Sequence, residues 1–155
     1  MCELSVYSDQ CEIARETTIL LVEDNAVMRE VLRELLELLH PDWHVLEAEN
    51  GLQGIEVAER IRPDVIVLDF NMPVMNGYEM ALSLQERPET SCIPLVLNSS
   101  EDSANPLVMR LRAMCSAVLN KPFSLGDIEH LFGNQFPQIR GHRQEFVPAF
   151  HTFPA

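Results

Sequence analysis

Acidic, hydroxyl and amine side chains follow several short apolar runs of this sequence, at the points where those runs end. Glu23 and Asp24 follow the first run, and Asp69 follows a later one. Ser99 and Lys121 follow two further apolar stretches. If the runs are parallel strands, all five side chains meet at one edge of a sheet, where ligands bind. Clustered carboxylate oxygens suit Mg²⁺, and an Asp carboxylate can accept a phosphoryl group as an aspartyl-phosphate.

Each residue type has a defined task in such chemistry. Phosphoryl transfer needs mainly positioning and stabilisation of charge, so a metal beside Asp69 would neutralise part of the incoming charge. Lys121 could pair with one phosphoryl oxygen, and the Ser99 hydroxyl could donate a hydrogen bond to another. Singly, these residues are ordinary helix caps, turn residues or surface residues. Their joint placement at the ends of successive runs is what predicts a site.

The runs that position these side chains are predicted to be strands buried on both faces. They lack the alternation of apolar and polar residues that marks a half-solvated strand. They cover residues 19–22, 43–48, 65–68, 93–97 and 117–119. Helices are expected at residues 28–39, 52–61, 78–87, 103–114 and 125–133. This alternation predicts a doubly wound α/β fold, with a five-stranded parallel sheet and helices on both faces.

The chain divides into three parts by its patterning. Residues 1–17 show no clear period and are expected to be an N-terminal extension, followed by one α/β domain at 18–134. Residues 135–155 hold three Pro, one Gly and four Phe without a period, so we expect a tail without its own core and no output domain. The Phe residues, Phe136 among them, could dock on the domain or on a partner, but a disordered end is the simpler expectation.

Composition excludes several classes of protein. The net charge of −13 disfavours binding to nucleic acid or to an anionic membrane, which both rely on clustered Lys and Arg. No apolar run approaches the ~20 residues that span a bilayer. The four cysteines form no C-x-x-C pair, so no zinc or redox motif is present. Free thiols and the absence of a signal-peptide pattern predict a reducing, cytoplasmic location.

The ordered motifs across residues 18–134 resemble those of the receiver domains of two-component response regulators. The matching residues are Leu21-Val22-Glu23-Asp24-Asn25, Pro63-Asp64-Val65-Ile66-Val67-Leu68-Asp69, Asn71-Met72-Pro73, Asn76-Gly77, Ile93-Pro94-Leu95-Val96-Leu97 with Ser99-Ser100, and Asn120-Lys121-Pro122-Phe123. Each motif is weak alone, but the set in this order is specific. The resemblance implies a flavodoxin-like, CheY-like fold with strand order 2-1-3-4-5.

The resemblance also implies a role for each matching residue in phosphoryl transfer. Asp69 would accept the phosphoryl group, usually from a sensor histidine kinase or a histidine phosphotransfer protein, and small phosphodonors can serve as well. Lys121 would pair with the phosphoryl group, and Ser99 would be the switch hydroxyl. Such a protein is a signalling switch that catalyses only its own phosphorylation and dephosphorylation.

A Mg²⁺ site is implied in the same way. Asp24 would bind the metal directly and Glu23 would act through water. Asp69 would share the metal, and Asn71 would contribute its backbone carbonyl.

Three positions depart from the family pattern, and none removes a catalytic group. Val118 stands where an aromatic residue is common, and it is too small to act as the aromatic half of the switch. Met114 replaces a common Gly, and Asn98 stands where an apolar residue is usual.

The expected output is a protein contact. By resemblance, a downstream partner would bind the surface formed by helix 103–114, strand 117–119 and helix 125–133, with Ser99 and Val118 as its switch positions. The protein would be a monomer or a weak dimer.

Two other functions compete with the switch. A phosphatase of the haloacid-dehalogenase type also forms an aspartyl-phosphate, but it needs a second Asp two residues after the nucleophile, where this chain has Asn71. A degenerate receiver would only bind a partner, and the presence of the full acidic, hydroxyl and lysine set argues against it.

Overall fold

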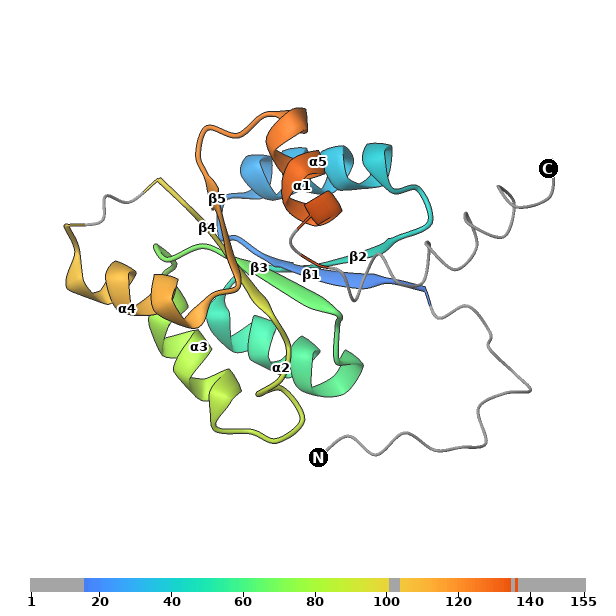
Figure 1. Ribbon diagram of the computed structural model, residues 1–155. Coiled ribbons are helices and arrows are strands. Elements are labelled where there is room, and N and C mark those ends of the chain that lie inside the picture. Colours follow the sequence, from blue (N-terminus) through green and yellow to red (C-terminus); the bar gives the residue numbers. More distant parts are fainter. Residues whose placement is uncertain (1–15, 101–103, 135, 137–155) are drawn as a thin grey trace, which may run out of the picture.

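A computed structural model describes residues 16–100, 104–134 and 136 of the chain. Strands and helices alternate along these residues (Figure 1). The strands are β1 (Thr18–Val22), β2 (His44–Ala48), β3 (Val65–Leu68), β4 (Leu95–Ser99) and β5 (Ala117–Asn120). The helices are α1 (Ala26–Leu39), α2 (Gly51–Ile61), α3 (Gly77–Gln85), α4 (Pro106–Met114) and α5 (Leu125–Asn134).

The strands form one parallel sheet in the order β2-β1-β3-β4-β5. Helices α1 and α5 cover one face, and α2, α3 and α4 cover the other (Figure 1). The predicted doubly wound fold and strand order are therefore confirmed. The order reverses direction between β1 and β3, which is where such folds bind ligands.

Each strand divides its side chains between two apolar layers, because successive residues of a strand point to opposite faces. On β3, Val65 and Val67 pack in the layer under α1 and α5, whereas Ile66 and Leu68 pack in the layer under α2 to α4. All four are fully or almost fully buried. Burial on both faces explains why the sequence of β3 shows no polar alternation.

Helices α1, α2, α3 and α4 each begin at an asparagine cap. Asn25 starts α1, where its side chain accepts hydrogen bonds from the amides of Val27 and Met28 at 3.0 and 3.1 Å. Asn76 starts α3 in a capping box with Glu79. A short polar side chain satisfies amides that have no partner inside the helix. The caps thereby fix where the chain turns after the strand ends.

The observed boundaries of β4 differ from the predicted ones. We predicted a strand at residues 93–97, but it begins at Leu95 and ends at Ser99. Pro94 precedes it, and the carbonyl of Pro94 accepts a hydrogen bond from the amide of Ile66 at 3.1 Å. Asn98 and Ser99 are thus strand residues, and both are buried.

Helix α4 also begins later than expected. It starts at Pro106, because the Asn105 side chain caps it by accepting from the amide of Leu107 at 3.0 Å. Pro106 occupies the first turn, the position that tolerates the missing amide hydrogen. Residue 103, at which we predicted the start of this helix, lies outside the described part of the chain.

Phe136 contradicts the expectation of an unattached tail at this residue. Its side chain is fully buried and stacks on Phe132 with ring centroids 5.6 Å apart. Phe132 in turn contacts Trp43 edge to face at 5.5 Å. The layer under α1 and α5 therefore extends to Phe136. The other Phe residues of the tail lie outside the described residues.

Candidate functional site

The carboxyl ends of four adjacent strands bring most of the predicted site residues to one edge of the sheet. Glu23 directly follows β1, and Asp69 directly follows β3. Ser99 is the last residue of β4 and pairs with Asn120 of β5, and Lys121 follows β5. Because β1, β3, β4 and β5 are neighbours in this order, their ends form one continuous edge.

Three carboxylates form a compact group at this edge. Glu23, Asp24 and Asp69 each offer one oxygen, and these oxygens all lie within 4.8 Å of one another. Glu23 and Asp69 are buried, whereas Asp24 is exposed. Clustered carboxylate oxygens with one member open to solvent fit a hard cation such as Mg²⁺, which prefers oxygen ligands and retains several waters.

Lys121 contacts two of these acids at once. Its ammonium donates to Glu23 Oε2 at 2.8 Å and to Asp69 Oδ2 at 3.2 Å. The Lys121 side chain is only 15% exposed, and the Glu23 and Asp69 side chains are 4% and 9% exposed. A buried acid requires a charge partner or a proton, so Lys121 compensates the charge of this pair.

The electrostatics of the group are dominated by burial. Burial raises the pKa of Glu23 and of Asp69, and the hydrogen bonds and charge of Lys121 oppose the rise without cancelling it. For Lys121, burial acts to lower the pKa, but hydrogen bonding to Glu23 and the charge of Asp69 outweigh it and raise the pKa. A second cation among the acids would favour their ionised forms.

The loop after Asp69 is shaped by backbone contacts. The amides of Phe70 and Asn71 hydrogen-bond to the Asp69 carboxylate, which acts to lower its pKa. The amide of Gly77 donates to the Phe70 carbonyl at 2.9 Å. A Cβ on Gly77 would collide with the carbonyl oxygen of Asp69. A glycine is therefore required where α3 begins, and it brings that helix against the acceptor residue.

Asn71, which we predicted to be a metal ligand through its carbonyl, lies two residues beyond Asp69 in an exposed position. Its amide reaches the Asp69 carboxylate. The structure thus keeps Asn71 beside the acid group.

Ser99 and Val118 lie on the two strands beyond Asp69. Ser99 is buried, and its carbonyl accepts a hydrogen bond from the amide of Lys121 at 3.4 Å. Val118 of β5 pairs with Leu97 of β4, and its side chain is half-buried in the layer under α2 to α4. With Asn120 and residues of α5 it lines a cavity of about 240 Å³.

Two residues near the site carry features that sequence reasoning did not assign to a role. Val74, in the loop after Asp69, has φ of 71° and is 81% exposed. Asn98 is 2% exposed and its Oδ1 has no hydrogen-bond partner. An asparagine inside a buried strand was the signal available for Asn98. No sequence signal marks the backbone of Val74.

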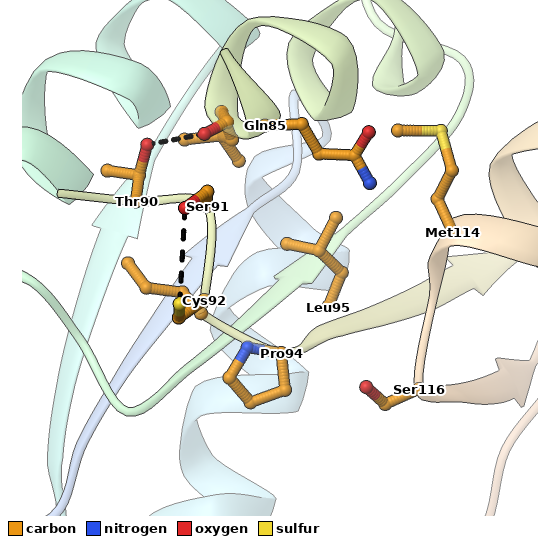
Figure 2. Close-up of a pocket in the computed structure, with 10 residues that line it drawn as sticks. Gln85, Thr90, Ser91, Cys92, Pro94, Leu95, Met114 and Ser116 are labelled. Atoms are coloured by element: carbon orange, nitrogen blue, oxygen red, sulfur yellow. Dashed lines mark hydrogen bonds between the residues drawn. The ribbon is translucent and has the colours of Figure 1, made fainter. Parts of the chain in front are cut away.

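A second cavity, of about 200 Å³, lies away from this edge (Figure 2). Pro94 and Ser116, which line it, precede β4 and β5, so the cavity lies at the amino ends of these strands. Near it, the Thr90 hydroxyl donates to the Leu84 carbonyl at 2.7 Å. This cavity holds none of the predicted site residues.

Among the described residues, no helix is both long and apolar enough to cross a membrane.

Comparison with curated proteins finds relatives that include histidine kinases. The chain is 36% identical to hybrid signal transduction histidine kinase D of Dictyostelium discoideum over 80% of its own length. It is 34% identical to protein PilH of Pseudomonas aeruginosa, over 67% of this chain and 84% of that protein. The chain spans only 8% of the Dictyostelium kinase and 10% of histidine kinase P4 of Formosa agariphila, to which it is 31% identical over 90% of its length.

Solved structures show the same architecture. The receiver domain of sensor histidine kinase PA1611 from Pseudomonas aeruginosa, which has a magnesium ion coordinated in its active site cleft, is 26% identical with a TM-score of 0.71. The match covers 79% of this chain and 98% of that domain. Chemotaxis protein CheY4 of Vibrio cholerae has a TM-score of 0.68 at 24% identity, over 77% of this chain and 98% of CheY4.

The family model for the response regulator receiver domain matches residues 19–132. That range contains the whole sheet except Thr18 at the start of β1, and all of the helices except the end of α5. It also contains the acidic group, Ser99 and Lys121. The chain belongs to the response regulator receiver domain family of two-component signalling.

Proposed function

We propose that this chain is a phosphorylation switch in which Asp69 accepts a phosphoryl group in the presence of Mg²⁺. The observation that carries the proposal is the setting of the Asp69 carboxylate. It is buried, it lies within 4.8 Å of carboxylate oxygens of Glu23 and Asp24, and it contacts the Lys121 ammonium at 3.2 Å. This arrangement supplies a carboxylate nucleophile beside the Lys121 ammonium and beside acids that can hold a cation.

The metal would be held by Glu23, Asp24 and Asp69, with the carbonyl of Asn71 as a further ligand. When bound, the ion supplies neutralisation of the negative charge on the transferring group. Asp24 is the exposed member of the set, so it faces the solvent from which a hydrated ion arrives. The donor set of oxygens alone suits Mg²⁺ rather than softer metals.

In the transfer step, an Asp69 carboxylate oxygen attacks phosphorus and forms the new P–O bond. The P–N bond to the donor's imidazole breaks, and the imidazole keeps the electron pair. Lys121 then exchanges its contact with the Asp69 carboxylate for a phosphoryl oxygen. The Ser99 hydroxyl donates to another phosphoryl oxygen, which draws the end of β4 toward the acceptor. The lifetime of the phosphoryl group then depends on how fast the protein hydrolyses the aspartyl-phosphate. No other reaction is proposed.

The phosphoryl donor in this proposal is a sensor histidine kinase or a histidine phosphotransfer protein. The histidine kinases among the relatives support this choice. Because the chain spans a small part of those proteins, their other activities are not carried over. No nucleic-acid or membrane partner is proposed, in keeping with the net charge of −13.

The output in this proposal is a surface formed by α4, β5 and α5 that binds a downstream protein. Val118 provides no aromatic ring to reorient, so the switch would act through Ser99 and the backbone of β4. The receiver domain is proposed to cover residues 18–134, between an extension (1–17) and a tail (135–155). A cytoplasmic monomer or weak dimer completes the proposal.

The test is to incubate the protein with Mg²⁺ and acetyl phosphate and to measure its intact mass. One added phosphoryl group is expected in wild type with Mg²⁺, and none is expected without Mg²⁺ or in Asp69→Asn, which is nearly isosteric. Absence of any adduct in wild type, together with no response to a beryllium fluoride phosphoryl mimic, would reject the switch in favour of a receiver that only binds a partner.

A further inference from the structure

Asn98 is a buried amide with an unmet hydrogen-bonding requirement. It is 2% exposed, and its Oδ1 has no partner among the described residues. Leaving a buried acceptor without a hydrogen bond costs stability. Such a group in a folded protein needs a physical explanation, because nearly all buried polar atoms are paired.

The register of the sheet places Asn98 beside the phosphoacceptor. β3 and β4 pair Leu68 with Leu97, so the next residues along, Asp69 and Asn98, are neighbours. Val96 packs in the layer under α1 and α5, whereas Leu97 packs in the opposite layer. By the alternation of strand side chains, Asn98 faces α1 and α5. Asp69 follows the same alternation on β3 and faces the same side.

The side chain of Lys121 has to reach across the end of β4 to make its observed contacts. Lys121 follows the edge strand β5, while its ammonium contacts Asp69 after β3 and Glu23 after β1. Neighbouring strands lie about 4.8 Å apart, so the lysine stem crosses the end of β4. Asn98 pairs with Leu119, two residues before Lys121 and therefore on the same face. Asn98 is the last residue of β4 on that face, at the end of the strand that the lysine crosses.

Among the residues that the register places around Asn98 on this face, Lys121 carries a hydrogen-bond donor on its side chain. Leu119 and Val96 are apolar, and the Asp69 side chain only accepts hydrogen bonds when it is ionised. An ammonium has three hydrogens to donate. Its hydrogen bonds to Glu23 and Asp69 occupy two of them.

A metal ion at the acidic group would compete for the oxygens that Lys121 now holds. Glu23 and Asp69 each belong to both sets, since they contact Lys121 and contribute to the acidic group. When their oxygens turn to a divalent cation, the ammonium loses acceptors in a mostly buried position. It then requires another acceptor nearby.

We propose that Asn98 is a positioning residue for Lys121, and that its Oδ1 accepts a hydrogen bond from the ammonium when a divalent cation engages Glu23 and Asp69. The inference rests on the proposed function, because it assumes that the acidic group binds Mg²⁺. It adds a residue that stabilises the metal-bound state relative to the metal-free state. The cost of the unpartnered oxygen is carried by the metal-free state alone.

The test is Asn98→Leu, which keeps the branching at Cγ and removes the acceptor. Titration calorimetry should show Mg²⁺ binding about tenfold weaker, the size of one hydrogen bond to a charged group. Without metal, the same variant should have a melting temperature a few degrees higher, because it removes an unsatisfied buried oxygen. Weaker metal binding together with a more stable metal-free protein is a combination that a general packing defect does not produce.

Two further variants isolate the role of Lys121. In a Lys121→Met background, Asn98→Leu should change Mg²⁺ affinity by less than about twofold, because the two side chains act as one unit. Thr90→Val is the control. It removes a buried hydroxyl that already donates to the Leu84 carbonyl, near the amino ends of β4 and β5. It should lower the melting temperature and leave Mg²⁺ affinity unchanged.

The outcomes separate this inference from the proposed function. If wild type and Asn98→Leu bind Mg²⁺ equally, or if the loss persists in the Lys121→Met background, Asn98 does not position Lys121 and the proposed function stands. If wild type binds no Mg²⁺ and gains no phosphoryl mass, both are rejected.

Discussion

The Lys121 ammonium lies closer to Glu23 than to Asp69, at 2.8 Å against 3.2 Å. Glu23 is the more buried partner, so the lysine is held mainly by the acid that is not the proposed acceptor. The contact between Lys121 and Asp69 is therefore the weaker of the two, and it is the one that Lys121 can exchange for a phosphoryl oxygen. A bound cation and Lys121 are competitors for the same two carboxylates.

Replacing Lys121 with Met should therefore shift the balance between metal-free and metal-bound protein. The metal-free protein should lose about 1 to 3 kcal/mol of unfolding free energy, because two buried acids lose their hydrogen-bond partner. Mg²⁺ should restore most of this stability and should bind severalfold more tightly than to wild type. Urea unfolding with and without Mg²⁺ measures both effects.

Arg33→Met provides the comparison, since Arg33 and Glu37 form an ion pair on the exposed side of α1. That variant should respond to Mg²⁺ as wild type does. A Lys121→Met protein that is as stable as wild type without metal, and binds Mg²⁺ less tightly, would contradict the competition.

Gly77→Ala should disrupt the loop that carries the acceptor. The added Cβ meets the Asp69 carbonyl oxygen, which is backbone and cannot move aside cheaply. We expect a loss of about 2 kcal/mol or more, in the range of overpacking against a fixed structure, together with weaker Mg²⁺ binding. Gly133→Ala is the matched control on α5, because a Cβ there meets nothing within 4 Å. It should be neutral or stabilising by up to about 1 kcal/mol. Equal effects of the two substitutions would show that the contact at Gly77 is not tight.

Val74→Gly should stabilise the protein. Val74 has φ of 71°, and the Met75 amide donates to the Pro73 carbonyl at 2.7 Å across it, a tight turn that strains a β-branched residue. Its side chain is 81% exposed, so little packing is lost. The expected gain is about 0.5 to 1 kcal/mol, after allowing for the greater freedom of Gly when unfolded. Val27→Gly, at an exposed site within α1, should instead cost about 1 kcal/mol. A loss at both positions would argue against strain at Val74.

The two described cysteines should differ in reactivity. Burial raises the pKa of the Cys115 thiol to about 12, whereas Cys92 is exposed. The thiolate is the reactive form, so at pH 8.5 Cys115 should resist iodoacetamide while Cys92 is alkylated. Raising the pH toward 10 should increase the Cys115 rate in proportion to hydroxide, with no plateau. Peptide mapping measures both sites, and in urea the protection of Cys115 should vanish. Equal labelling in the folded protein would contradict the burial of Cys115.

The sheet was predictable because its strands are buried on both faces, and continuous apolar runs such as Val65–Leu68 record that burial directly. The acidic group was predictable because parallel strands end at a shared edge, which brings Glu23 and Asp69 together across 46 residues of chain.

The contact of Lys121 with Glu23 was not predicted, since it depends on the path of a flexible side chain across β4. Phe136 was misjudged because its burial depends on Phe132 and Trp43, and a lone Phe in a Pro-containing segment shows no period. The backbone of Val74 had no signal, because Val is not a residue that favours positive φ.

The most direct measurement is to locate the phosphoryl group after reaction with acetyl phosphate and Mg²⁺. Borohydride reduces an aspartyl-phosphate to homoserine, so peptide mapping after reduction marks the acceptor. The account predicts homoserine at position 69 in wild type and none in protein incubated without Mg²⁺. Modification at Asp24, Asp64 or any other residue, with Asp69 intact, would contradict it.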